Sequence, residues 1–398
     1  MGLCDDFLCP YYGQLPYQEY ELLSRSVRQL ENNRSGLYPG DTSPWLPLRG
    51  IKPNSTHFKG VWNWDSAFHA MAVCRWDVEL AREQVRIFLN IQGEDGMFPD
   101  VWRMETNEIF RGCSKPPVFP WAVWELEKQE HNETFLQDCR KAFRKNLEFW
   151  YNRRGGAENN GLCHYDGESK DPEERQLYGG WESGWDNSPR WDNGIQFQLA
   201  VDLNCYLVIA YRAMAHFARL SNDEADAADW QQKADSLAQK IEETFWDEQS
   251  GCYFDYDIRK KDFTREITPA SFMPLFLGTA SPERAEKMAE IAREHMMPHW
   301  PSVSYHSAAF DPDGYWRGRA WLNIAYFALK GLKMYGFDDI ADEGRRVILD
   351  RVARSAAGPA ENYDPVTGEP RGLPHFSWSA VFCIKFLQDW NTPEIFNT

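Results

Sequence analysis

Apolar side chains recur at helical spacing along most of this chain. In 77–92, for example, Val78, Ala81, Val85 and Phe88 would share one face of a helix. The pattern predicts twelve helices and few strands, apart from a short extended piece at 251–258. The predicted helices lie at about 17–32, from 65, 77–92, 118–130, 133–153, 194–219, 223–246, 269–277, from 281, 316–335, 338–354 and 375–390. Ser221 with Glu224 resembles a capping box before the seventh helix.

Two kinds of helix alternate in this order. From the third helix on, every second one is amphipathic, as expected of a helix that faces water. The helices between them are apolar nearly all round, most clearly in 195–210, 321–332 and 376–387. Six exposed and six buried helices predict an all-α fold, an (α/α)6 barrel of six inner and six outer helices. We expect a single catalytic domain over 1–398, and not a solenoid, because no fixed period of repeats runs through the chain.

The loops before the inner helices would all open on one rim of such a barrel. They are 57–64, 110–117, 180–193, 262–268, 304–315 and 359–374. Most of the Trp-, Tyr-, Pro- and carboxylate-rich stretches outside the helices lie in them, whereas the opposite connections, such as 75–76 and 336–337, are very short. Functional side chains concentrate in loops on a rigid scaffold, so we expect the site at this rim. The polar insertion 155–178 is a candidate flap over it.

Composition and charge narrow the class of protein. Of the 398 residues 15% are aromatic, with 18 Trp, and the net charge is −17. An acidic surface argues against nucleic acid and anionic membranes as partners. The nine Cys form no CxxC pair, so neither disulfides nor a zinc site is favoured. We expect no metal and no cofactor. The first residues do not resemble a signal peptide, so a cytoplasmic protein is expected, and a homo-oligomer remains open.

The stretch 180–192 combines three Trp, three carboxylates and an Arg around Gly184 and Pro189. Aromatic faces suit sugar rings, and a pair of carboxyl groups can cleave a glycosidic bond. Asp186 is the candidate general acid, because aromatic walls would raise its pKa. Glu182 and Asp192 are its rivals, although Asp192 could instead cap the next helix. Glu361 is the candidate general base, because the turn residues around it leave it without an obvious structural role.

Other rim residues are candidates for binding the substrate. They are Trp62, Trp64, Asp65, Lys115, Trp185, Arg190, Trp316, Arg317, Trp321, Tyr363, His375 and Trp378. Several have a plain structural alternative. Asp65 could be only a helix cap, and single tryptophans at such positions are most often core residues.

Five segments together resemble glycoside hydrolase family 63 and, more distantly, the family 37 trehalases. They are 60–65 (GVWNWD), 182–192 (ESGWDNSPRWD), 315–321 (YWRGRAW), 361–368 (ENYDPVTG) and 376–379 (FSWS). The resemblance implies an (α/α)6 barrel that hydrolyses α-glycosides with inversion. It implies Asp186 as the acid and Glu361 as the base. It also assigns Trp64, Asp65, Arg317, Trp321 and Trp378 to the sugar pocket.

The chain looks closest to short bacterial-type members that act on glucosylglycerate or mannosylglycerate. Arg111 and Lys115 are then candidates for binding a glycerate carboxylate. The expected function is an inverting α-glycosidase for a small α-glucoside or α-mannoside. The alternatives are a trehalase-like enzyme, a sugar epimerase or isomerase that uses His57, His306 or His375 as a base, and a sugar-binding protein without catalysis.

Overall fold

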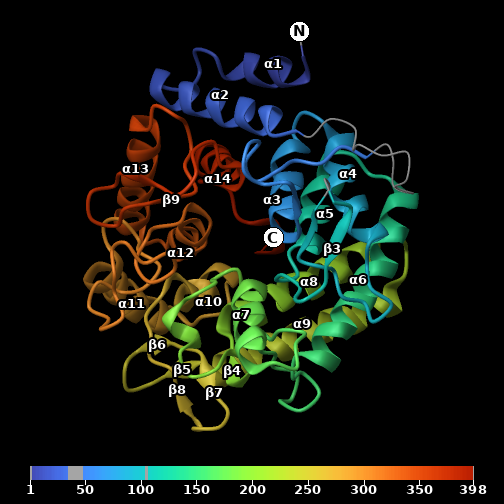
Figure 1. Cartoon of the computed structure of the whole chain (residues 1–398), viewed down its shortest axis with the longest axis vertical. Coiled ribbons are helices and arrows are strands. Elements are labelled where there is room, and N and C mark those ends of the chain that lie inside the picture. Colours follow the sequence, from blue (N-terminus) through green and yellow to red (C-terminus); the bar gives the residue numbers. More distant parts are fainter. Residues whose placement is uncertain (1, 35–47, 104–105, 398) are drawn as a thin grey trace.

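Six inner helices form a closed ring in the computed structural model, which describes residues 2–34, 48–103 and 106–397. They are α3 (Asn63–Val73), α5 (Phe119–Gln129), α8 (Val201–Leu220), α10 (Met273–Leu277), α12 (Leu322–Met334) and α14 (Ser377–Gln388). Each packs against the next, and α14 returns to pack against α3 (Figure 1). The contact between first and last helix makes the ring a barrel and excludes an open solenoid.

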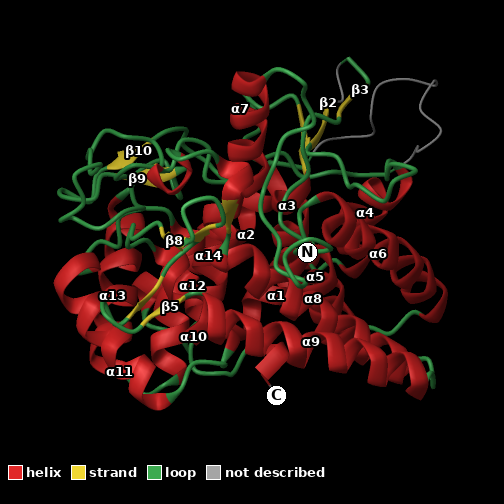
Figure 2. Cartoon of the chain, turned by 90° about the horizontal axis from the view of Figure 1, so that it is seen from below, coloured by secondary structure: helices red, strands yellow, loops and turns green. Residues whose placement is uncertain are grey.

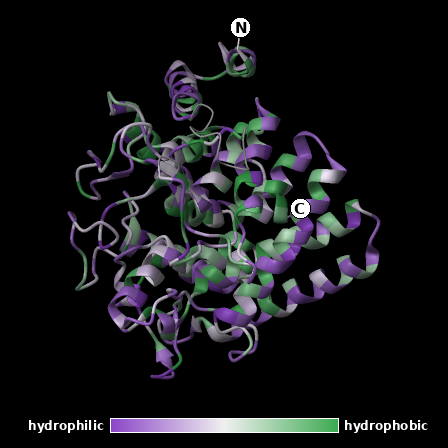
Figure 3. Cartoon of the chain, turned by 45° about the vertical axis from the view of Figure 1, so that its right-hand side comes forward, coloured by the Kyte–Doolittle hydropathy of each residue, from purple (hydrophilic) through white to green (hydrophobic). Residues whose placement is uncertain are grey.

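Six outer helices surround this ring. They are α2 (Tyr17–Asn32), α4 (Val78–Asn90), α6 (Glu133–Arg153), α9 (Glu224–Thr244), α11 (Pro282–Ile291) and α13 (Asp338–Arg354). For example, α2 packs on α14, α4 on α3, α9 on α8 and α13 on α12. Every residue of α3 is buried, whereas α9 buries only one face, and Figure 3 shows hydrophilic residues along the outer helices and loops. The predicted (α/α)6 barrel is therefore confirmed. No helix in the described ranges is both long and apolar enough to span a bilayer.

Loops and short antiparallel strands complete the fold. They are β1 (Gly60–Trp62), β2 (Val101–Arg103) and β3 (Glu108–Phe110) in one sheet, β4 (Gln198–Leu199), β7 (Tyr256–Asp257) and β8 (Asp262–Phe263) in a second, and the pairs β5 (Trp246–Asp247) with β6 (Cys252–Tyr253) and β9 (Asn362–Tyr363) with β10 (Pro370–Arg371). A short helix, α1 (Leu3–Leu8), precedes α2. Figure 2 shows many of the loops gathered on one side of the helices, with α7 (Pro172–Ser183) standing among them.

Helix α7 was not predicted. It takes up the end of the candidate flap, 155–178, and the first four residues of the stretch 180–192. Its start carries a signal that sequence reasoning passed over: Asp171 caps the amides of Glu173 and Glu174, and Pro172 occupies the first helical position. Whether 155–178 closes over the rim stays a prediction.

Other helix starts differ from the sequence prediction as well. The helix expected over 316–335 begins only at Leu322, and the first four residues of the one expected over 269–277 form a 3-10 turn before α10. The helix expected over 194–219 begins only at Val201, because a 3-10 turn at Ile195–Phe197 and strand β4 come first. Helix α9 is capped by Asp223, whose side chain accepts from the Asp226 amide at 3.2 Å, and not by Ser221. The Ser221 hydroxyl instead donates to Glu133, on the neighbouring outer helix α6.

Candidate active site

The end of helix α7 determines where Asp186 lies. The helix stops at Gly184, which has φ +76°, and a Cβ there would come 2.2 Å from the indole of Trp64. Only glycine combines this left-handed conformation with so close a neighbour. Two residues earlier, Glu182 is fully buried and accepts two hydrogen bonds from Arg154, at 2.7 and 2.8 Å. Glu182 therefore anchors α7 and is no longer a rival for the role of acid.

Asp186 follows this turn and remains partly exposed. Burial raises the pKa of its carboxyl to about 6, and the nearby charges of Asp100 and Glu361 add to the rise. Lys115 acts in the opposite direction. A carboxyl group with such a pKa keeps much of its proton in mildly acidic solution, which is what a general acid requires.

Glu361 lies in the loop that leads into strand β9, and it is 6% exposed. One carboxylate oxygen accepts from the Tyr315 hydroxyl at 2.5 Å, and the other accepts from the amide of Leu373 at 3.0 Å. A Cβ at Gly372, which has φ +67°, would come 2.4 Å from this second oxygen. Both oxygens of Glu361 are thus held in place by donors from two further segments.

A single loop joins the acid to the base. Asn187, directly after Asp186, accepts from the amide of Trp316 at 2.9 Å. The residue before Trp316 is Tyr315, which donates to Glu361. The loop before α12 therefore bridges the two candidate carboxyl groups, which lie 175 positions apart in the sequence.

Five tryptophans line up beside these carboxyl groups. Trp316 stacks on Trp321 with ring centres 3.9 Å apart and planes within 2°, and Trp185 lies 5.2 Å from Trp316. Trp378 meets the edge of Trp321 at 5.5 Å and of Trp64 at 5.4 Å. All five are buried. They form a rigid wall and offer little open ring face, whereas Trp62 is partly exposed and packs edge-on against Phe58.

Asp65 and Lys115 lie within the same charged cluster as the acid. Asp65 is in the first turn of α3 but does not cap it, because the cap position is Trp62. It is 4% exposed, and burial raises its pKa to about 7. Lys115 donates to the carbonyl of Trp181 in α7, and burial opposes its charge while Asp100, Asp186 and Asp65 raise its pKa.

Sequence reasoning missed Asp100, which is buried just before β2 and lies 3.4 Å from the Lys115 amine. Burial raises its pKa as well. No motif marked it, because a single carboxylate after Phe98-Pro99 looks like any turn residue. A backbone hydrogen bond holds Asp100 beside the start of helix α3, because the amide N–H of Asn63 donates to the carbonyl of Asp100 at 2.8 Å.

Two predicted binding residues serve the fold instead. Arg190 is 1% exposed, and both Asp202 and Asp255 accept from its guanidinium at 2.7 to 3.0 Å. Its donors are thereby occupied within the protein, so the expected sugar contact is not available. Tyr363 is fully buried, and its hydroxyl accepts from the amide of Ala360 at 2.9 Å. Both side chains are thus buried and bonded within the chain, which argues against a direct contact with a sugar for either.

Four other candidate residues lie nearer the surface. Arg317 pairs with Asp192 at 2.7 Å, and the Asp192 side chain is 54% exposed. Asp192 does not cap the helical segments that follow it, because their cap positions are Gly194 and Ala200. Its exposed carboxylate also lacks the aromatic enclosure that would suit an acid. His375 is exposed and bonds Gln29 of α2 at 3.0 Å. Arg111 is exposed too and donates to the Ile91 carbonyl at 2.7 Å.

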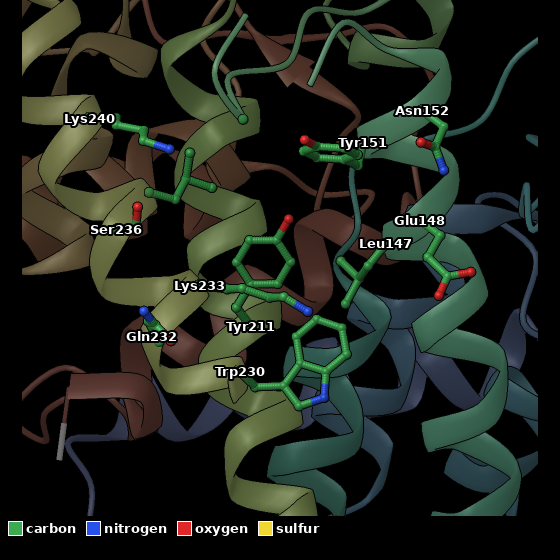
Figure 4. A pocket seen from close by; sticks show the side chains of 12 residues that line it. Leu147, Glu148, Tyr151, Asn152, Tyr211, Trp230, Gln232, Lys233, Ser236 and Lys240 are labelled. Atoms are coloured by element: carbon green, nitrogen blue, oxygen red, sulfur yellow. The ribbon is translucent and has the colours of Figure 1, made fainter. Parts of the chain in front are cut away.

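A separate hollow of about 440 Å³ lies on the outside of the barrel, between α6 and α9 (Figure 4). Trp230 stacks on Tyr211 of α8, with ring centres 5.7 Å apart, and Lys233 lies 4.4 Å from the Trp230 ring. Glu148 is the one carboxylate among its lining residues. The hollow therefore lacks the pair of acids that a glycosidase requires, unlike the cluster around Asp186.

The family profile of the mannosylglycerate hydrolase MGH1-like glycoside hydrolase domain matches residues 59–379 of this chain. A mannosylglycerate hydrolase of Thermus thermophilus is 27% identical, with 90% of this chain and 99% of that protein aligned. Mannosylglycerate hydrolase MGH1 of Selaginella moellendorffii is 25% identical, with 92% of this chain and 87% of the relative aligned.

Solved structures agree with these relatives. The family 63 mannosylglycerate hydrolase from Thermus thermophilus, crystallised with glucose, has a TM-score of 0.73 at 26% identity and covers 91% of this chain and 99% of its own. Neutral trehalase Nth1 of Saccharomyces cerevisiae has a TM-score of 0.70 at 18% identity, over 88% of this chain and 76% of its own, which shows the fold alone. The resemblance to family 63 that the five segments carry is confirmed.

Proposed function

We propose that this chain cleaves mannosylglycerate with inversion at the anomeric carbon. The chain belongs to the family of mannosylglycerate hydrolase MGH1-like glycoside hydrolase domains, and it is therefore a glycoside hydrolase. The observation that carries the proposed mechanism is the pair Asp186 and Glu361. They come from two different loops beside one aromatic wall, and one of them has a pKa raised to about 6.

In the proposed reaction, Asp186 donates its proton to the glycosidic oxygen while the bond from that oxygen to the anomeric carbon breaks. Glu361 takes a proton from a water molecule, whose oxygen forms the new bond on the opposite face of the sugar. The products are the free sugar and glycerate, and the proton gained by Glu361 returns to Asp186 through solvent. The Tyr315 hydroxyl and the Leu373 amide hold Glu361 in one orientation for this step.

Asp65 and the tryptophan wall are proposed to bind the sugar ring. A carboxyl group with a pKa of about 7 exists in both protonation states near neutrality, so Asp65 can accept from or donate to sugar hydroxyls. The wall of Trp64, Trp321 and Trp378 excludes water on one side. Dehydration strengthens the electrostatic interactions that a developing positive charge on the sugar requires.

Lys115 is the buried cation that could meet the glycerate carboxylate. In the structure it is bonded to Trp181 and paired with Asp100, so binding glycerate would require it to exchange a partner.

The first test is hydrolysis of α-mannosylglycerate, α-glucosylglycerate and trehalose, with the anomeric form of the released sugar followed by NMR. We expect mannosylglycerate to be cleaved and the β-anomer to appear first. First release of the α-anomer would contradict inversion, and cleavage of trehalose alone would favour the trehalase-like alternative.

The second test replaces each catalytic carboxylate by its amide. Asp186→Asn and Glu361→Gln should each lower kcat by about 10²–10⁴-fold, because proton transfer in the transition state is lost. The matched controls are Asp192→Asn and Glu369→Gln, which remove exposed carboxylates from the same two loops and should leave kcat and the fold unchanged. Near-normal turnover by either amide variant would reassign that role.

A further inference from the structure

Lys115 and Asp100 form a buried ion pair in the mouth of the barrel, and neither is needed for the two proton transfers. The Lys115 amine lies 3.4 Å from a carboxylate oxygen of Asp100, and each side chain is only 7% exposed. The amine also lies 5.8 Å from the centre of the Trp64 ring. Burying two charges costs desolvation free energy that their mutual attraction does not always offset, so their position requires an explanation.

The pair is attached to the last turn of helix α7. Lys115 donates from its amine to the carbonyl of Trp181, and the amide of the preceding residue, Ser114, donates to Glu182 at 3.0 Å. Glu182 in turn is held by Arg154. Two neighbouring residues of one loop thus hold the last turn before Gly184, from which the chain turns to Asp186.

Asp100 is fixed just as firmly from the other side. Its amide donates to the carbonyl of Cys113 at 3.0 Å, and its carbonyl accepts from the amide of Asn63 at 2.8 Å. The backbone around Asp100 therefore joins the loop that carries Lys115 to the start of helix α3. Neither member of the pair can move far without disturbing both elements.

The titratable groups around the Asp186 carboxyl come from five segments. The charges of Asp100 before β2, Lys115 before α5 and Glu361 before β9 act on Asp186 directly. Tyr315 before α12 interacts with both Asp186 and Asp65 of α3, and Asp65 also interacts with Lys115. Four carboxyl groups, counting Asp186, thus share this space with Lys115. Neighbouring negative charges raise the pKa of each carboxyl group, whereas the positive charge of Lys115 lowers it.

We propose that Lys115 and Asp100 are positioning residues for the general acid: together they fix the exit of helix α7, and they place two opposite charges beside Asp186. The proposal rests on the function proposed above, in which Asp186 is the acid. It extends that function, because the pair adjusts the pH range over which Asp186 keeps its proton.

The two members of the pair should act in opposite directions. The acid must be protonated, so activity is lost as pH rises through its pKa. Without the cation of Lys115 the acid keeps its proton to higher pH, and without the anion of Asp100 it loses it at lower pH. Lys115→Gln, which retains a donor for the Trp181 carbonyl, should move the alkaline limb of the kcat/KM profile up by about one pH unit. Asp100→Asn should move it down.

The experiment measures kcat/KM for mannosylglycerate from pH 4 to pH 9 on the full chain, with thermal unfolding of each variant at one pH. Lys115→Arg keeps the positive charge but changes the packing, so the alkaline limb of its kcat/KM profile should stay at the native pH. Opposite shifts in Lys115→Gln and Asp100→Asn support the proposal. Limbs that stay in place, or that move in the same direction in both variants, overturn it. If Lys115→Gln does not fold, the direction of the shift in Asp100→Asn decides alone.

Two further variants, Asp186→Asn and Asp65→Asn, distinguish a failure of this proposal from a failure of its premise, that Asp186 is the general acid. Asp186→Asn that remains active refutes the proposed function itself, whereas an inactive Asp186→Asn with unmoved limbs refutes only the role of the pair. Asp65 also faces Lys115, so the shift is measured again in the Asp65→Asn background. A shift that persists there belongs to Asp186, and a shift that vanishes there assigns the alkaline limb to Asp65 and overturns the proposal.

Discussion

Acidic side chains at the two ends of the barrel have opposite properties. At the closed end, Asp389 follows α14 and accepts from Arg75 at 2.7 and 2.9 Å and from Lys385 at 2.9 Å. These two cations hold the pKa of its carboxyl well below the usual range, although burial alone would raise it. At the mouth, Asp65 and Asp186 share Lys115 with further carboxylates, and their pKa values rise to about 7 and about 6.

The difference indicates that acidic side chains stabilise the fold at the closed end and hold protons at the mouth. At the closed end, two cations around one Asp satisfy it and join the ends of α3 and α14. At the mouth, the excess of carboxyl groups costs stability but keeps protons available in a range useful for catalysis. Active sites commonly accept such a cost. Substitutions of Asp in the two places should therefore change different properties of the protein.

The largest effect on stability is expected from Asp389→Asn. The variant leaves Arg75 and Lys385 close together without their shared carboxylate, which should lower the free energy of unfolding by about 3–5 kcal/mol. Because the folded-state pKa of Asp389 is lowered, its contribution is present above the unfolded-state pKa and is lost as pH falls through the folded value. Urea unfolding at pH 7 and pH 3 measures both the loss of stability in the variant and its dependence on pH.

The matched control for this prediction is Asp229→Asn, which removes an exposed carboxylate paired with Lys233. It should change the free energy of unfolding little. We expect kcat/KM of Asp389→Asn to remain normal under conditions where it is folded. A loss of activity larger than the folded fraction explains would contradict the separation of the two ends.

An intermediate effect with the opposite sign is expected from Asp65→Asn. The folded-state pKa of about 7 lies above the unfolded value, so Asp65 makes the protein less stable as pH rises from about 4 to 7. The amide variant should therefore be more stable than the native chain at pH 8, by at most about 4 kcal/mol, and gain little at pH 4. It should also bind the sugar less well. An equal gain at both pH values would show that charge is not the cause.

The smallest effect is expected from Arg317→Gln at the outer rim. The pair with Asp192 is partly exposed, so its loss should change the free energy of unfolding by less than about 1 kcal/mol. The resemblance to family 63 places Arg317 in the sugar pocket, whereas in this structure its guanidinium is engaged by Asp192. We expect a Michaelis constant close to the native value. A large increase would instead support the predicted contact between Arg317 and the sugar.

Local patterns predicted the helical framework and the two loops with the main carboxyl groups. They predicted less well what each side chain contacts. Arg190 lies within the stretch 180–192, yet it binds Asp202 and Asp255 and not an open site. Helix α7 was missed because Gly179 and Gly180 are poor helix formers, and its last turn is stabilised by Arg154, Ser114 and Lys115 from other segments.

The alternation of amphipathic and apolar helices is a property of the sequence alone, since each helix must bury its apolar side whatever its neighbours are. That alternation determined the barrel, and the clustering of Trp and carboxylates in the loops between pointed to the end at which the proposed chemistry lies. Only the tertiary structure decided which carboxyl groups are paired and which are crowded. Asp100, Asp186 and Asp389 are the same residue type, and their protonation depends on charges brought near from distant parts of the chain.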